Sequence, residues 1–150
     1  MPQSLYNNYI HIVFGTKYRQ PLIDDAIKSE LFAYMAGTCN ALGCPPVRVG
    51  GYDDHVHILC QLSKSLPLMK LIAEIKANSS RWIKTKGRNY HNFYWQEGYA
   101  AFSVSYRQID IIEKYIRNQA EHHRKTTYQA EFISLLKENQ LAYDERYLWD

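Results

Sequence analysis

The chain has 150 residues, 46% hydrophobic and 22% charged, as in one globular domain, and no stretch approaches the roughly eighteen apolar residues that a membrane span needs. Its three cysteines form no Cys-x-x-Cys pair, which argues against a disulfide framework or a zinc ribbon. The net charge of +3 favours a polyanionic partner but does not establish one.

The N-terminal part of the chain predicts a strand followed by a helix. Residues 8–17 are predicted to form a strand with apolar side chains on both of its faces. Pro21 ends this strand. Asp24 and Asp25 then open a helix whose apolar positions follow helical spacing until Gly43.

A hairpin is expected next. A short strand over residues 47–50 and a longer one over residues 55–62 are separated by a turn that begins at Gly50 and Gly51. The alternate residues that share one face of the longer strand are Val56, Ile58 and Cys60. This pattern predicts a hairpin whose loop lies around Asp53.

The rest of the chain predicts one more strand and three more helices. The expected elements are a helix over residues 65–87, a strand over residues 101–106, a helix over residues 108–123 and a helix over residues 127–139. An aromatic tail follows at residues 143–150.

This order of elements predicts an α+β fold. The sequence β-α-β-β-α-β is that of a ferredoxin-like sandwich, here with additional C-terminal helices and with residues 1–150 forming one domain. In such a fold, helices cover one face of an antiparallel sheet, and we expect the other face to be free for a ligand or a partner.

Two features bear on location and partner. The first residues, Met-Pro-Gln-Ser-Leu-Tyr, have no basic start followed by an apolar run, so we expect no secretory signal and a reducing cytoplasm. The chain has 13 tyrosines against 5 phenylalanines. Tyrosine suits unpaired bases and phosphates, although it also fills half-exposed core positions.

The histidine pair His55-Val56-His57 is the first candidate for a chemical site. Side chains at positions i and i+2 of a strand share a face, with Cα atoms about 6.5 Å apart, so the two imidazoles can lean onto one divalent ion while Val56 points into the core. The same tripeptide also occurs on strands that bind no metal.

Tyr115 and Gln119 are the second candidate. In the helix over residues 108–123, Ile109, Ile112 and Ile116 form the core stripe. Residues four apart lie one turn above each other, so the tyrosine hydroxyl and the glutamine amide are expected to face the same place. The alternative is that Tyr115 packs at the core margin and Gln119 is solvated.

The histidine pair followed by Tyr115-Ile-Arg-Asn-Gln119 resembles the single-tyrosine HUH transposases of bacterial insertion sequences, whose relatives include the REP-associated tyrosine transposases. Other matching motifs, in the same order, are His11 with Thr16-Lys17-Tyr18-Arg19, Trp95-Gln96-Glu97-Gly98-Tyr99, Gln119-Ala-Glu-His122-His123 and Tyr143-Asp-Glu-Arg-Tyr147-Leu-Trp149. The sequence departs from this family at Asp53-Asp54, which affects the turn before His55.

The resemblance implies a metal-dependent DNA transposase. Tyr115 would be the nucleophile that cleaves and rejoins single-stranded DNA at hairpin-marked ends through a 5′-phosphotyrosine, and His55, His57 and Gln119 would hold Mg²⁺ or Mn²⁺. No nucleotide cofactor would be needed. The alternatives are a domesticated protein that binds or nicks DNA hairpins, or another HUH nickase class without transposition activity.

The resemblance also implies a homodimer, in which the tyrosine helix of one subunit can serve the histidine pair of the other. The connection between the fourth strand and the tyrosine helix is short, at residues 106–108, which limits how far Tyr115 can travel. The sequence leaves open whether Tyr115 acts in its own chain or in its partner.

Several other residues are candidates for DNA contacts. The basic side chains proposed to contact phosphates are Lys17, Arg19, Lys76 and Arg81, each of which could equally be an ordinary solvated charge. We expect His11 to be a satisfied core histidine. His122 and His123 would either reach the DNA backbone or stabilise the C-terminus of their helix.

Overall fold

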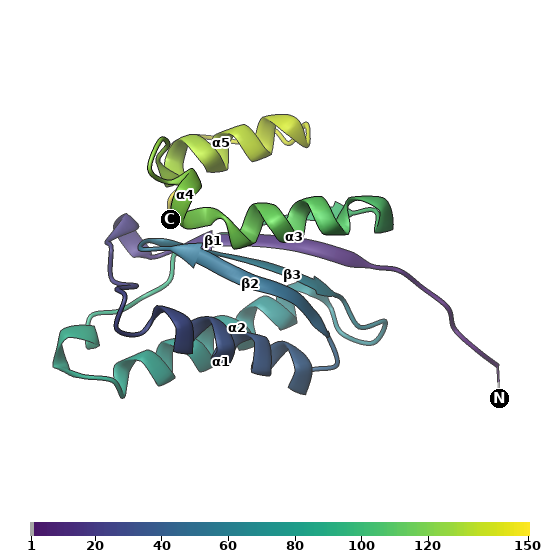
Figure 1. Cartoon of the computed structure of the whole chain (residues 1–150), viewed down its shortest axis with the longest axis horizontal. Coiled ribbons are helices and arrows are strands. Elements are labelled where there is room, and N and C mark those ends of the chain that lie inside the picture. Colours follow the sequence, from purple (N-terminus) through teal and green to yellow (C-terminus); the bar gives the residue numbers. More distant parts are fainter. Residues whose placement is uncertain (1) are drawn as a thin grey trace.

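The computed structural model describes residues 2–150 and confirms the α+β fold. Its four strands are β1 (Tyr9–Gly15), β2 (Pro46–Tyr52), β3 (His55–Gln61) and β4 (Ala100–Val104). They form one antiparallel sheet in the order β2-β3-β1-β4 (Figure 1), so the two central strands are β3 and β1. This is the strand order of the predicted ferredoxin-like sandwich.

Helices α1 (Lys28–Ala41) and α2 (Leu68–Lys84) cover one face of the sheet, as expected (Figure 1). The alternation in β1 and β3 sends every second side chain toward these helices. The buried residues that meet in this core include Ile10, Ile12, Phe14, Val56, Ile58, Cys60, Leu31, Met35, Leu71 and Ile75.

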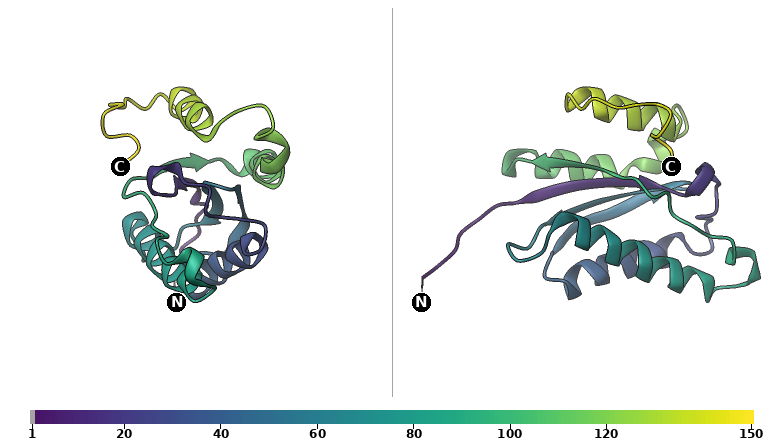
Figure 2. Two further views of the ribbon diagram at one scale, coloured as in Figure 1. Left: turned by 90° about the vertical axis from the view of Figure 1, so that its left-hand side faces the viewer. Right: turned by 180° about the vertical axis from the view of Figure 1, so that it is seen from behind.

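The opposite face is covered as well, so the expectation of a free face is wrong. Helices α3 (Ile109–Arg117), α4 (Gln119–His122) and α5 (Tyr128–Glu138) lie over it, and Figure 2 shows the sheet between the two helical layers. The physical reason lies in the strands, which carry apolar residues on both faces. The residues that form the cores under this second layer are Val13, Ala100, Phe102, Tyr128, Phe132, Leu136, Leu59, Val104 and Ile116.

The predicted helix over residues 108–123 is broken in two. Asn118, with φ −98° and ψ 22°, leaves the helical conformation between α3 and α4. The chain turns there toward α5 (Figure 1), and α4 is a short segment that begins at Gln119. The break therefore separates Tyr115 from Gln119 into two elements, although the helix over residues 127–139 is found nearly as predicted.

Gly50 allows α3 to pack closely on the sheet beside the histidine pair. It is paired with His57 across β2 and β3. A Cβ atom at this position would lie 2.9 Å from the carbonyl oxygen of Ile116 and 3.0 Å from its Cγ2. No side chain fits there without moving α3.

We expect Gly50→Ala to lower the free energy of unfolding by about 1–3 kcal/mol, because overpacking must push α3 away from β2. Gly37→Ala is the matched control, since nothing lies within 4 Å of a Cβ at this exposed position in α1. It should raise the free energy of unfolding by about 0.5–1 kcal/mol through helix propensity. Urea unfolding of both variants measures the difference, and equal stabilities would contradict the close packing.

The C-terminal tail ties α5 to the rest of the chain. Trp149 packs against Tyr128 and Phe132 of α5, and the carbonyl oxygen of Asp150 accepts a hydrogen bond from Gly98 N at 2.9 Å. Within residues 2–150, no helix has both the length and the apolar character needed to cross a membrane.

Candidate active site

Strand β3 presents His55 and His57 on the face under α3, α4 and α5. Both side chains are fully buried, and Val56 between them lies in the opposite core, as the alternation predicts. Because β3 is a central strand, neighbours on both sides fix its backbone. The two imidazoles are therefore held on a rigid support.

The two helices above the strand bring Tyr115 and Gln119 to the histidine pair. Gln119 Oε1 lies 2.9 Å from His55 Nε2, and the Tyr115 ring meets the His57 ring edge-on with centroids 5.6 Å apart. The structure thus brings together all four residues proposed for catalysis and metal binding. They belong to one chain, so the helix of a partner subunit is not needed to assemble this arrangement.

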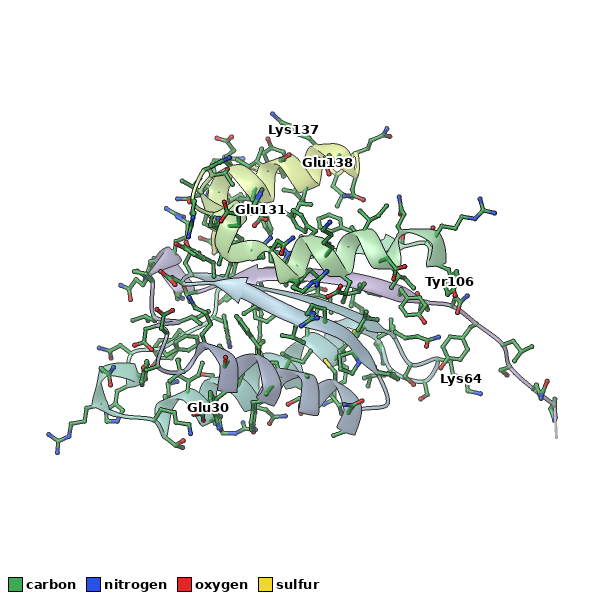
Figure 3. The ribbon with its side chains drawn as sticks, viewed as in Figure 1. Glu30, Lys64, Tyr106, Glu131, Lys137 and Glu138 are labelled. Carbon is green, nitrogen blue, oxygen red and sulfur yellow. The ribbon has the colours of Figure 1, made fainter. Side chains whose placement is uncertain are left out.

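Glu131 of α5 lies at the centre of these groups, and the sequence interpretation missed it. Its Oε1 is 3.1 Å from the Nε2 atoms of both His55 and His57. Its Oε2 accepts hydrogen bonds from the Tyr115 hydroxyl and from Gln119 Nε2, the latter at 2.9 Å. Figure 3 shows Glu131 on the side of α5 that faces α4 and the sheet, whereas Lys137 points outward.

His123, directly after α4, joins the same cluster. Its Nε2 lies 2.9 Å from Gln119 Oε1 and 3.1 Å from Glu131 Oε1. The neighbouring His122 differs, because its side chain is 37% exposed and its Nε2 lies 3.3 Å from Glu131 Oε2 without hydrogen-bond geometry. The proposed DNA-backbone and helix-end roles therefore do not describe His123, whose ring is buried inside the site.

The Nδ1 atoms of the histidine pair also have polar partners. His55 Nδ1 lies 2.8 Å from Asp54 Oδ1, and His57 Nδ1 lies 2.8 Å from His11 Nε2. His11 is buried and satisfied, as expected, but it also orients His57. Such contacts fix the ring orientation of metal-binding histidines.

The donor atoms suit a divalent metal ion. Imidazole nitrogens, an amide oxygen and a carboxylate oxygen converge, and those of His55, His57 and Glu131 lie within 4.8 Å of one another. These donor types bind divalent first-row metals in proteins. The residues present therefore fit the metal that the sequence resemblance implies.

Comparison with protein families matches residues 4–119 to the family described as Transposase IS200 like. The chain belongs to this family. The match includes the histidine pair, Tyr115 and Gln119 and confirms the sequence resemblance, while His123 and Glu131 lie beyond the matched residues. None of the curated proteins compared with the chain matches it.

Two solved structures share the fold of this IS200-like transposase. A protein from Deinococcus radiodurans R1, provisionally named a transposase, has a TM-score of 0.62 and 22% identity over 79% of this chain and 98% of its own. A REP-associated tyrosine transposase bound to a REP hairpin has a TM-score of 0.60 and 12% identity over 82% of this chain and 74% of its own.

Burial and hydrogen bonds shift the pKa values of the histidines and of Glu131 in the candidate site. Burial disfavours a charged His55, but hydrogen bonds to Asp54 and Glu131 outweigh it and raise the pKa of His55 to about 9. Burial lowers the pKa of His57 to about 4 despite the attraction of Glu131. Burial would raise the pKa of Glu131, but hydrogen bonds from the histidines hold it well below its usual range.

Tyr115 is held as a neutral phenol. Burial, and then the negative charge of Glu131, raise the pKa of Tyr115 well above its ordinary value of 10. The hydroxyl therefore keeps its proton, which it donates to Glu131 Oε2. Beside the hydroxyl, a cavity of about 340 Å³ opens between α3 and α5. Its lining includes Tyr115, His11, His122, Glu131, Ile111 and Leu135.

The four basic residues proposed for DNA contacts lie outside this cluster. Lys17 and Arg19 belong to a single 3-10 turn directly after β1, whose last residue, Gly15, pairs with His55. This turn is therefore at the same end of the sheet as the site. Arg19 lies over the Trp149 ring, 5.2 Å from its centroid.

Lys76 and Arg81 lie on α2, which covers the other face of the sheet. Lys76 Nζ donates to three backbone carbonyls, those of Gln96, Glu97 and Gly98, at 2.7–3.0 Å. Burial lowers its pKa to about 8. This ammonium is engaged in holding the loop before β4 rather than directed at solvent, while Arg81 contacts only Asn78 among the described hydrogen bonds.

Proposed function

We propose that this transposase cleaves and rejoins single-stranded DNA through Tyr115, with a divalent ion held by residues that include His55, His57 and Gln119. One observation carries the proposal: the tyrosine hydroxyl, both imidazoles and the Gln119 amide nitrogen all contact the single carboxylate of Glu131. A nucleophile must lie beside the groups that stabilise the reacting phosphate, and one cluster supplies both.

In the proposed reaction, the Tyr115 oxygen attacks the scissile phosphorus. The new bond joins tyrosine to the 5′-phosphate, and the bond from phosphorus to the preceding 3′ oxygen breaks. The proton lost by the hydroxyl balances the one that the leaving 3′ oxygen takes up, which yields a free 3′-hydroxyl. Attack by a 3′-hydroxyl reverses these steps and releases Tyr115, so the phosphodiester energy is kept and no nucleotide cofactor is consumed.

The chain's own residues prepare this attack. Glu131 Oε2 accepts the hydrogen bond of the Tyr115 hydroxyl and so fixes where its oxygen points. Asp54 and His11 hold the imidazoles of His55 and His57 in place. A bound divalent ion, Mg²⁺ or Mn²⁺, supplies polarisation of the scissile phosphate and offsets charge on the leaving oxygen. The cavity beside Tyr115 leaves room for the phosphate to approach.

The proposed substrate is single-stranded DNA that carries a hairpin, and the proposed assembly is a homodimer. The hairpin proposal is supported by a structural neighbour, since the REP-associated tyrosine transposase was solved bound to a REP hairpin. Lys17 and Arg19 are the proposed phosphate contacts, because their turn lies at the end of the sheet that carries His55.

The form of the DNA provides the experimental test. Oligonucleotides that tile both flanks of the gene and fold into hairpins with single-stranded tails are expected to form a covalent adduct with the protein when Mn²⁺ is present. Binding should weaken as salt rises, because phosphate contacts release counterions. The adduct is measured on a denaturing gel, and binding is measured by fluorescence anisotropy.

The same oligonucleotides annealed to their full complements are the control. Equal adduct formation from the paired and unpaired forms would contradict single-strand specificity. Hairpin binding without any adduct, under the same metal conditions, would instead identify a protein that recognises DNA hairpins without cleaving them.

A further inference from the structure

We propose that the metal site of this chain has five protein donors rather than three, and that it selects a first-row transition-metal ion such as Mn²⁺ over Mg²⁺. The five donors are His55 Nε2, His57 Nε2, Gln119 Oε1, His123 Nε2 and Glu131 Oε1. The inference deepens the proposed function by defining the ion and its ligands.

Five separations between donor atoms match those of adjacent positions around one six-coordinate ion. Metal–ligand bonds of about 2.1 Å at right angles place adjacent donors about 3.0 Å apart, whereas a tetrahedral ion of the same bond length places them about 3.4 Å apart. Glu131 Oε1 is 3.1 Å from the Nε2 atoms of His55, His57 and His123. Gln119 Oε1 is 2.9 Å from the Nε2 atoms of His55 and His123. These separations favour six-coordination with one position left for substrate.

A hydrogen-bond network alone explains this arrangement less well. Three imidazole nitrogens lie 3.1 Å from Glu131 Oε1, and two of them, those of His57 and His123, already use the roughly two lone pairs of this oxygen, while His55 Nε2 pairs with Gln119 Oε1. The other ring nitrogen of His57, Nδ1, already faces His11. The cluster therefore contains more inward-facing donors than hydrogen bonding to one oxygen requires.

The Nδ1 atom of His123 is held by a polar partner, as are the Nδ1 atoms of His55 and His57. Histidines that bind metals almost always have their second ring nitrogen held by a polar partner. His123 Nδ1 lies 2.9 Å from the carbonyl oxygen of Thr126, which corresponds to the Asp54 contact of His55 and the His11 contact of His57. His122 has its Nε2 buried but without a hydrogen-bond partner among the described residues, and it contacts the other oxygen of Glu131.

The types of donor atom favour a first-row transition-metal ion over Mg²⁺. Mg²⁺ prefers oxygen ligands, keeps several waters and is rarely enclosed by protein donors alone. Here three of the five donors are imidazole nitrogens, and all five side chains are nearly fully buried. Imidazole and carboxylate ligands together suit Mn²⁺ and the later first-row ions, whose affinity for nitrogen is higher.

Metal binding to the full-length protein without DNA tests this inference independently of cleavage. Titration calorimetry is expected to show one site that binds Mn²⁺ at least about 100-fold more tightly than Mg²⁺. His123→Ala and Glu131→Gln should each weaken Mn²⁺ binding by at least about 10-fold, the usual scale for disturbing a metal site. Co²⁺ should give the weak visible bands of a six-coordinate ion rather than the intense bands of a tetrahedral one.

The matched control lies on the same helix as Glu131. Glu138→Gln should leave Mn²⁺ affinity within about threefold of wild type, and thermal melting of each metal-free variant checks its fold. Near wild-type affinity in His123→Ala and Glu131→Gln, or equal affinity of the wild type for Mg²⁺ and Mn²⁺, would overturn the five-donor site. Adduct formation by the wild type would survive that result, so failure of the inference is distinguishable from failure of the proposed function.

Discussion

Tyr115→Phe is expected to abolish the covalent protein–DNA adduct, with a loss of strand cleavage of at least about a thousandfold, as for other enzymes that lose their nucleophile. The change removes only the phenolic oxygen. It deletes the hydrogen bond to Glu131 Oε2 but leaves the ring packed against His57. The measurement is a denaturing gel with a 3′-labelled hairpin substrate at saturating metal, because the tyrosine keeps the fragment on the 3′ side of the cleaved bond.

Tyr106→Phe is the control, because this tyrosine is 71% exposed and lies only a few residues before α3. It should keep the activity of the wild type. Mn²⁺ binding by Tyr115→Phe should also persist, since all five proposed donors remain. A persistent adduct in Tyr115→Phe would show that another residue is the nucleophile.

The double variant His55→Ala/His57→Ala is expected to lose Mn²⁺ binding and all detectable cleavage, because both imidazoles face the same carboxylate and no other group replaces them. The two substitutions also leave cavities under α3, α4 and α5 that should lower the free energy of unfolding. Circular dichroism must therefore first confirm the fold. The folded variant is treated with a chelator and then supplied with metal again. If it still nicks DNA, the histidine pair is not the metal site.

Mixing this double variant with Tyr115→Phe tests which chain supplies the tyrosine. Tyr115 lies beside the histidines of its own chain, in contact with the same Glu131. Mixtures are therefore expected to stay inactive, even when exchange of subunits is demonstrated with tags of different size. Recovery of a fraction of wild-type cleavage would instead mean that Tyr115 serves the histidine pair of a partner during the reaction.

The sheet and the histidine pair were predictable because they depend on local patterns. Alternation in β1 and β3 sets which side chains share a face, and strand geometry alone puts His55 beside His57. The covered second face was not predicted, although Val13 and Leu59 on that face of the strands are apolar and fully buried. Apolar residues on both faces of a central strand indicate two helical layers.

Glu131 could not be identified from local sequence, because its role depends on contacts 74 and 16 residues away, with His57 and Tyr115. A glutamate in a helix is usually solvated. Its position offered one signal, since it lies between the buried aromatics Tyr128 and Phe132 on the inward face of α5. The break at Asn118 was also hidden, because no glycine or proline marks it between residues 108 and 123.

The position of Glu131 has a consequence for biosynthesis. The strand that carries the histidine pair is translated first, and the carboxylate that gathers its imidazoles follows 74 residues after His57. Until α5 has left the ribosome and docked, a nascent chain lacks the carboxylate that accepts the Tyr115 hydrogen bond and lies beside the histidine nitrogens. The proposed cleavage centre therefore stays incomplete until α5 has docked, which separates synthesis of the histidine strand from the proposed capacity to cut DNA.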